Sequence, residues 1–199
     1  AAACSVDPAN GVSDGVGLAA ATEIVRLQLQ TGGKRLRGLL PVAVVTRESG
    51  DVQAALRFGA AIEAIHNGTL VHDDIQDKDT LRRGKPTLWT QTGIPQAINA
   101  GDVLLVAPIT AILADSALSD SLSRSLASLL AGALLETIRG QVADVGLRDA
   151  GAVTREQLSG IACAKTSPLF ACALQGAGMI LGASEQRLQA ARVCGHRLG

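Results

Sequence analysis

One long apolar helix face that ends in a cluster of aspartates constrains the fold of this chain most. Asp51 can cap a helix, and the residues after it place apolar side chains at helical spacing along one wide face: Val52, Ala55, Leu56, Ala60, Ile62 and Ile65. The pattern predicts a helix that continues to Asp74. Because so wide an apolar face has to be buried, this helix is expected to pack inside a larger helical body.

The rest of the sequence also favours helices over strands. Alanine and leucine dominate, whereas aromatic residues make up only 2% of the chain, a composition that suits close-packed helices. Further helices are expected over residues 95–113, 121–147, 154–164, 168–181 and 184–197, with a loop over 80–93 and a helix break at Pro168. The predicted fold class is all-α.

Length and composition indicate one folded unit. With 199 residues and 47% hydrophobic content, the chain can bury one substantial core. Residues 1–14 lack a sustained apolar period and are predicted to be a flexible start. No Pro/Ser-rich or single-sign charged linker divides the remainder, so residues 15–199 are expected to form a single domain.

The charge balance excludes several classes of partner. Lys and Arg total 18 and so do Asp and Glu, so no global field attracts nucleic acid or an anionic membrane. The apolar run 103–114 is shorter than the roughly 20 residues that span a bilayer, and Pro108 is expected to interrupt it, so no membrane span is predicted. Four cysteines without metal-type spacing and the lack of a secretory pattern favour a cytoplasmic location.

Three aspartates close the long predicted helix. At about 3.6 residues per turn, Asp73 and Asp77 share a face, so their oxygens can converge on a hard cation such as Mg²⁺, while Asp74 points elsewhere. Magnesium usually takes one or two protein carboxylates and completes its shell with water and phosphate oxygens. The pair therefore indicates a diphosphate site, although a solvated acidic helix end would give the same residues.

Two basic clusters support the diphosphate interpretation. The segment RRGKPT places Arg82 and Arg83 on a constrained loop shortly after the aspartates, and GGKRLRG places Lys34 and Arg37 three positions apart on one face of an expected helix. Either cluster alone would be ordinary surface charge. Together with the aspartates, they favour binding of two diphosphate groups.

Other polar residues extend this pattern more weakly. His66 and Thr69 precede Asp73 by seven and four positions, so they continue its stripe along the helix and could line a cavity wall. A histidine on an apolar helix is more often a satisfied core residue, and His72, off this stripe, is assigned to structure. Farther along, the segments GQVAD and KT are each compatible with an ordinary helix surface.

Taken in order, these segments resemble the trans-isoprenyl diphosphate synthase, or polyprenyl synthetase, family. GGKRLRG, IHNGTLVHDDIQD, RRGKPT, INAGD, GQVAD and KT follow the family's order from about Gly32 to the end of the chain. The resemblance implies an antiparallel helical bundle around a deep apolar cavity, normally a homodimer. It also implies Mg²⁺-dependent, head-to-tail condensation of isopentenyl diphosphate with an allylic diphosphate.

The same resemblance suggests residue roles. Asp73 and Asp77 would ligate magnesium, and they form the catalytic set with Lys165 and Thr166. The substrate-binding residues would be divided between two diphosphates. Isopentenyl diphosphate would be held by Lys34, Arg37, His66 and Arg83, and the allylic diphosphate by Arg82, Lys165 and Thr166. Gln141, from the segment GQVAD, is a further substrate-binding candidate.

Product length would depend on the cavity floor below the aspartates. Gly68 and Thr69, five and four positions before Asp73, are not aromatic, so an open floor and a product longer than farnesyl are expected, with geranylgeranyl diphosphate favoured. Ile65, another turn away, could set the limit.

Two departures from the family pattern leave alternatives open. No second aspartate-rich motif precedes Gly199, so the chain is expected to lack its C-terminal helices, and Gly38 stands where proline is common. A class I terpene cyclase would ionise one substrate, but it would not need the GGKRLRG cluster. A non-catalytic subunit of a prenyl synthase heteromer would explain the missing motif, but not the retained aspartates.

Overall fold

The computed structural model describes residues 16–147 and 153–199, and these residues are almost entirely helical. The elements, in chain order, are α1 (Val16–Leu29), α2 (Leu36–Arg47), α3 (Val52–Asp77), β1 (Leu81–Arg82), β2 (Lys85–Pro86), α4 (Leu88–Thr92), α5 (Ile94–Leu113), α6 (Asp120–Leu147), α7 (Arg155–Ile180) and α8 (Glu185–Leu198). The all-α prediction is confirmed. The predicted flexible start, 1–14, lies outside the described residues.

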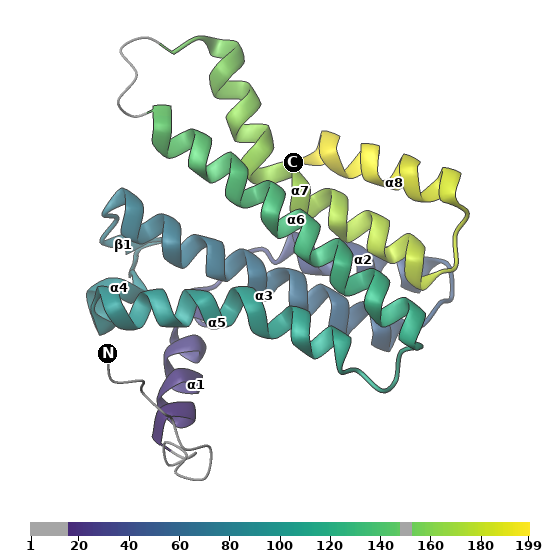
Figure 1. The fold of residues 1–199 in the computed structure, drawn as a ribbon, viewed down its shortest axis with the longest axis horizontal. Helices are drawn as coiled ribbons and strands as arrows, with labels where there is room; N and C mark the ends of the chain where they lie inside the picture. The colour runs from purple at the N-terminus through teal and green to yellow at the C-terminus, as the bar shows by residue number, and fades with distance from the viewer. Residues whose placement is uncertain (1–15, 148–152) are drawn as a thin grey trace, which may run out of the picture.

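Helix α3 is the predicted aspartate-bearing helix. It begins where Asp51 Oδ1 accepts a hydrogen bond from the Ala54 amide at 3.0 Å, which satisfies one of the free amides of the first turn. Its last residue is Asp77, and the capping residue that follows, Lys78, has a left-handed φ of 57°. The helix therefore extends past Asp74 and includes Asp77. In Figure 1, α3 and α5 run antiparallel, side by side, with α6 and α7 crossing above them.

The main core forms where α3, α6 and α7 meet. Phe58 and Ile62 of α3 pack with Leu126 and Leu130 of α6, and all four side chains are fully buried. Burial of each of these side chains stabilises the folded chain by about 1.5–3 kcal/mol. Gly176 of α7 lies so close to the Phe58 ring that a Cβ would collide with it. This close approach holds the two helices that carry opposite sides of the site.

The predicted helix break at Pro168 is wrong. Helix α7 continues through Pro168, whereas α5 continues through Pro108 as the single helix expected over 95–113 requires. An interior proline removes one backbone hydrogen bond and costs about 3 kcal/mol in an isolated helix. In α7 the Ser167 hydroxyl donates to the Cys163 carbonyl at 2.7 Å, and both Ser167 and Pro168 are buried. Tertiary packing of α7 against α6 and α8 therefore outweighs the local preference.

Residues 80–93 are more ordered than the predicted loop. Strands β1 and β2 form an antiparallel hairpin that pairs Arg82 with Lys85. Its two turn residues, Arg83 and Gly84, have φ values of 54° and 76°, as a type I′ turn requires. The Thr87 hydroxyl donates to the Asp79 carbonyl at 2.8 Å. Short strands and the five-residue α4 carry too little periodicity to be read from the sequence.

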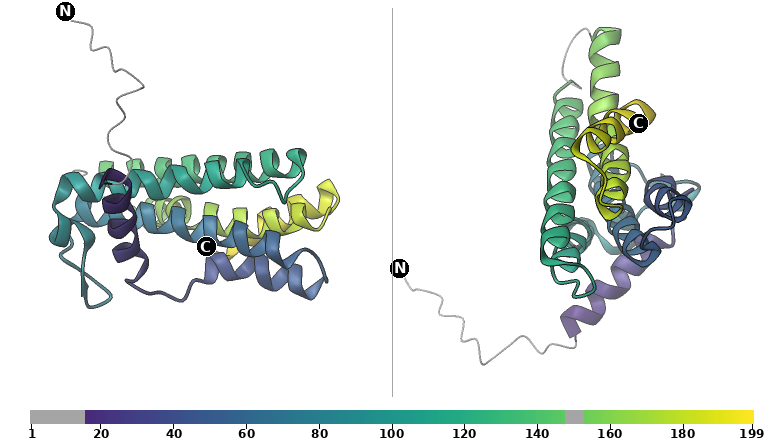
Figure 2. Two further views of the ribbon diagram at one scale, coloured as in Figure 1. Left: turned by 90° about the horizontal axis from the view of Figure 1, so that it is seen from below. Right: turned by 90° about the vertical axis from the view of Figure 1, so that its right-hand side faces the viewer.

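The remaining helices complete the bundle. Figure 2 shows α6 and α7 as an antiparallel pair whose joined ends project beyond the other helices, with α8 against α7. Among the described helices, only α5 has the length and apolar composition to cross a membrane, and core helices of many proteins meet the same criterion.

Candidate active site

Asp73 is the centre of a polar network that joins three helices. Its Oδ1 accepts hydrogen bonds from Gln141 Nε2 of α6 at 2.9 Å and from Lys165 Nζ of α7 at 3.2 Å. Lys165 Nζ also lies 2.8 Å from Asp144 Oδ2, and Gln141 Nε2 lies 2.7 Å from Gln76 Oε1. The segments HDDIQD, GQVAD and KT, far apart in the sequence, thus meet at one point.

The charge of Lys165 is stabilised by this network. Burial of the ammonium opposes its charged form, but the hydrogen bond to Asp144 and the charge of Asp73 outweigh that effect and raise the pKa of Lys165. Lys165 therefore stays cationic, and it supplies a fixed positive charge beside the Asp73 carboxylate.

Arg82 of the hairpin neutralises the other side of the aspartate cluster. Its Nε lies 2.6 Å from Asp74 Oδ1, and an Nη atom lies 3.5 Å from Asp73 Oδ2. Burial raises the pKa of Asp74, and Arg82 offsets part of this effect. Since the Asp74 side chain is almost fully buried, its pairing with Arg82 fixes the hairpin to the end of α3.

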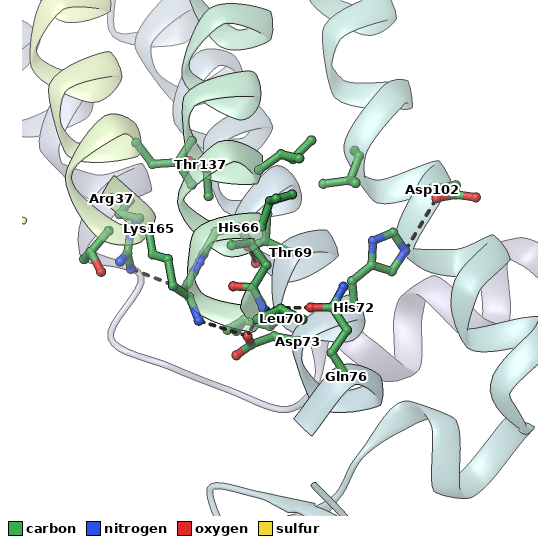
Figure 3. A pocket seen from close by; sticks show the side chains of 17 residues that line it. Arg37, His66, Thr69, Leu70, His72, Asp73, Gln76, Asp102, Thr137 and Lys165 are labelled. Carbon is green, nitrogen blue, oxygen red and sulfur yellow. Dashed lines mark hydrogen bonds and ion pairs between the residues drawn. The ribbon is translucent and has the colours of Figure 1, made fainter. Parts of the chain in front are cut away.

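A cavity of about 760 Å³ opens beside this network (Figure 3). Seven of the predicted site residues line it: Arg37, His66, Thr69, Asp73, Gln141, Lys165 and Thr166. Apolar side chains from four helices form much of the rest of the wall, including Leu70, Leu105, Ile138 and Leu169. The cavity thus combines a polar end with apolar walls, as a ligand that has a charged head and a hydrocarbon tail requires.

A second cavity of about 470 Å³ adjoins the first. Arg37, His66 and Leu70 line both cavities, so they form a shared wall. The second cavity is also lined by Lys34 and Arg83, together with Arg35 and the backbone of the glycine pair before it. It is therefore strongly basic, whereas the first cavity contains the aspartate network.

Arg37 and His66 hold each other in the shared wall. An Nη atom of Arg37 lies 3.2 Å from His66 Nε2, so Arg37 donates a hydrogen bond and this imidazole nitrogen accepts it. Burial and the nearby arginine charges lower the pKa of His66 to about 3, so the ring is neutral at pH 7. Arg37 also stacks over the Phe170 ring, 4.5 Å from its centroid, a favourable cation–π contact.

Several predicted residues lie elsewhere. Lys34 precedes α2, which begins at Leu36, so Lys34 and Arg37 do not share a helical face as predicted. The left-handed Arg35, with a φ of 50°, turns the chain between them, and both side chains still reach the basic cavity. Asp77 does not line the larger cavity, although it lies at the last position of α3.

The predicted chain-length residues also separate. Thr69 lines the larger cavity, whereas Ile65 is fully buried in the core. Gly68 faces α5, where a Cβ would meet Leu105 and the Gly101 carbonyl. Its missing side chain therefore lets α3 and α5 approach, and neither Gly68 nor Ile65 lines the cavity.

Sequence reasoning missed part of the site. His72, assigned to structure, lines the larger cavity with Asp102, and its Nε2 lies 3.5 Å from an Asp102 oxygen. The segment INAGD could have indicated this position of His72, because the His72 ring packs against Gly101 of that segment. Phe170, in the basic cavity, follows Thr166 by one helical turn and could have been found from that spacing.

The fold and cavities define the class: an all-helical protein that encloses a ligand-sized space within its bundle. The polyprenyl synthetase family pattern matches residues 19–199, so the chain belongs to that family. A geranylgeranyl diphosphate synthase of Saccharolobus solfataricus is 36% identical over 169 residues, 84% of this chain and 51% of that protein. A farnesyl diphosphate synthase of Bacillus subtilis is 35% identical over 178 residues, 86% of this chain and 60% of that protein.

Solved structures agree with this assignment. The geranylgeranyl pyrophosphate synthetase from Pyrococcus horikoshii Ot3 superposes with a TM-score of 0.84 at 31% identity, over 92% of this chain and 56% of that one. The resemblance to the polyprenyl synthetase family noted in the sequence is thus confirmed. The chain spans about half the length of the curated relatives it matches.

Proposed function

We propose that this chain provides the substrate-binding half of a Mg²⁺-dependent prenyltransferase. The reaction is head-to-tail condensation of isopentenyl diphosphate with an allylic diphosphate. The observation that supports it is the pair of adjoining cavities, one with the aspartate network and apolar walls and one strongly basic, which share Arg37, His66 and Leu70. Two diphosphate substrates whose hydrocarbon ends must meet require this arrangement.

The end of α3 fits a magnesium ion held partly by substrate. Asp73 and Asp77 lie one turn apart and offer hard oxygen ligands. Within residues 16–147 and 153–199, no group of three or more His, Cys, Asp or Glu side chains is arranged to hold a metal by itself. Two carboxylates plus phosphate oxygens are the usual magnesium set. When bound, the ion would stabilise the negative charge of the departing diphosphate.

The chain's own residues would complete the allylic site. Arg82, Lys165 and Thr166 would contact the allylic diphosphate, and the two cations would stabilise it as it leaves. Gln141 would hold Asp73 in place through its 2.9 Å hydrogen bond. The apolar walls formed by Leu105, Ile138 and Leu169 would keep water from the allylic cation.

The basic cavity would hold isopentenyl diphosphate through Lys34, Arg37, His66 and Arg83. The double bond of this substrate would attack the allylic carbon and form the new carbon–carbon bond. Bond formation would leave a carbocation, and the released diphosphate would take up the proton whose loss from that cation re-forms a double bond. Neutral His66 would accept one hydrogen bond from Arg37, and the remaining N–H groups of Arg37 would donate to the diphosphate.

We further propose geranylgeranyl diphosphate as the product. Thr69 is the predicted chain-length residue that lines the larger cavity, and its small side chain leaves room for a long hydrocarbon chain. Relatives named for both geranylgeranyl and farnesyl products occur at similar identity. Chromatography of the products made from each allylic primer tests this, and farnesyl diphosphate as sole product would overturn it.

Magnesium-dependent incorporation of labelled isopentenyl diphosphate into an extractable prenyl product is the direct test of the reaction. Condensation, by the chain or by a longer protein that includes it, is the expected result. Consumption of the allylic diphosphate without incorporation would favour a class I terpene cyclase. Activity only after a different synthase chain is added would favour the non-catalytic subunit.

We also propose a homodimeric, cytoplasmic protein in which residues 15–199 act as one unit. Helix α5 carries several exposed apolar side chains that a second copy would cover: Ile94, Ile98, Val103, Val106 and Leu113. Sedimentation equilibrium would give twice the chain mass, and a monomer at micromolar concentration would contradict the dimer. Fractionation of cells that express the full protein tests its location.

A further inference from the structure

Backbone carbonyls at the end of α1 and in the turn that follows it bind three positively charged side chains. Three carbonyl groups there accept side-chain hydrogen bonds: Leu29 from Arg35 at 3.1 Å, Gln30 from Lys85 at 2.9 Å, and Gly32 from Arg83. The last carbonyls of a helix lack intrahelical partners and carry the negative end of its dipole. They are therefore suited to hold positive side chains that have no carboxylate partner.

The basic cavity needs such partners because it concentrates like charges. Lys34, Arg35, Arg37 and Arg83 line it, and Glu63 is the acidic residue among its described lining residues. Oε1 of Glu63 already accepts a hydrogen bond from the Gly38 amide at 2.9 Å. Mutual repulsion would disperse the four cations unless neutral acceptors fixed their positions.

The position of Arg83 depends on several neighbours at once. Its φ of 54° is uncommon for a residue with a side chain and costs on the order of 1 kcal/mol. Gly33, with a φ of 139°, has no Cβ, and a Cβ there would collide with the Arg83 guanidinium. The Arg83 guanidinium can therefore keep this position only while the hairpin turn and the Gly33 backbone stay fixed relative to each other.

Lys85 joins these two segments without lining either cavity. It pairs with Arg82 across the hairpin, and its Nζ reaches the Gln30 carbonyl, 55 positions earlier in the chain. Its side chain thus connects the hairpin to the turn whose Gly32 carbonyl holds Arg83. This geometry distinguishes Lys85 from the cations that face the cavity.

We propose that Lys85 is a positioning residue: its hydrogen bond to Gln30 fastens the β1–β2 hairpin to the end of α1 and thereby holds Arg83 in the basic cavity. This inference rests on the proposed function, because the ligand of that cavity is taken to be isopentenyl diphosphate. Lys85 then sets affinity for this substrate through Arg83, without touching it.

Calorimetric titration of isopentenyl diphosphate, without metal, tests the effect on binding. Lys85→Ala is expected to weaken affinity about fivefold, the usual worth of one such hydrogen bond. Lys85→Arg keeps a donor of similar reach and should restore affinity. Arg187→Ala, which removes a charge from α8, is the matched control and should change nothing. Unchanged affinity in Lys85→Ala overturns the proposal.

A double-mutant cycle with Arg83→Ala separates positioning from direct attraction. If Lys85 acts through Arg83, adding Lys85→Ala to Arg83→Ala should cause less than a twofold further loss. A full fivefold further loss would mean that Lys85 attracts the diphosphate by its own charge, which would contradict a positioning role. Binding of an allylic diphosphate with Mg²⁺ should be equal in wild type and Lys85→Ala.

Amide hydrogen exchange of the ligand-free chain tests the fastening itself. Lys85→Ala should speed exchange in peptides that cover residues 30–35, while Lys85→Arg should not. Identical exchange in the two variants would overturn the proposal. If the wild type binds no isopentenyl diphosphate although exchange responds as expected, the proposed function fails and the fastening by Lys85 stands.

Discussion

Arg82 and Arg83 are adjacent in the chain, yet they contact different parts of the site. Arg82 donates to Asp74 at the end of α3, whereas Arg83 donates to the Gly32 carbonyl beyond α1. The separation arises because Arg82 ends β1 and Arg83 begins the turn with positive φ. One short hairpin therefore supplies a cation to the aspartate cluster at the end of α3 and another to the basic cavity.

Replacement of Asp73 tests the role of the polar network. Asp73→Ala should lower turnover of the active protein by roughly a thousandfold, because it removes a proposed magnesium ligand and its charge stabilisation. The helical circular dichroism signal should stay the same, since Lys165 still pairs with Asp144. Steady-state kinetics at saturating Mg²⁺ measure the effect.

Asp120→Ala is the matched control for Asp73→Ala. Asp120 is an exposed carboxylate in the first turn of α6 and pairs only loosely with Arg124, at 3.9 Å. Wild-type turnover is expected for it. If Asp73→Ala turns over as fast as this control, Asp73 has no part in the chemistry.

Lys34 is expected to act on one substrate only. Lys34→Ala should weaken binding of isopentenyl diphosphate by about tenfold or more, because it removes a charge-assisted contact from the basic cavity. The Michaelis constant for the allylic substrate should change little, since Lys34 does not line the larger cavity. Equal losses for both substrates would contradict the division into two sites.

Phe58 should dominate the stability of the core. Phe58→Ala should lower the free energy of unfolding by about 3–5 kcal/mol, because the ring is fully buried between α3 and α7 and its removal leaves a cavity. Chemical denaturation followed by circular dichroism measures the change. Leu56→Ala, on the same helix but 45% exposed, should cost less than about 1 kcal/mol. Similar losses in both variants would show that α3 does not form the core.

The sequence predicted the part of the structure that depends on long periodic helices. The aspartate-bearing helix was predicted within three residues of its end, since its N-cap and apolar face are local features. The unbroken α7 could not be predicted at Pro168, because burial between neighbouring helices decides the outcome there. Arg35 and Arg83 adopt positive φ values that their residue types disfavour, so local propensity gives no sign of those turns.

The site was predictable in its residue types but less so in its geometry. The motifs identified Asp73, Gln141 and Lys165, and the structure brings all three together. The shared wall of the two cavities could not be predicted, because it depends on how α2 crosses α3. Gly68 was assigned to the cavity floor, although its contact with α5 becomes visible only when the helices are packed.

His66 should make stability depend on pH. Its pKa is about 3 in the folded chain against 6.5 in the unfolded chain, so the unfolded state binds more protons as the pH falls below 6.5. His66 therefore costs no stability above pH 6.5, and below this pH its effect progressively lowers the free energy of unfolding until about pH 3. Between pH 8 and pH 5, wild type should lose about 2 kcal/mol more free energy of unfolding than His66→Asn. Urea denaturation at each pH measures this difference, and parallel curves for the two proteins would show that His66 is not held neutral by burial.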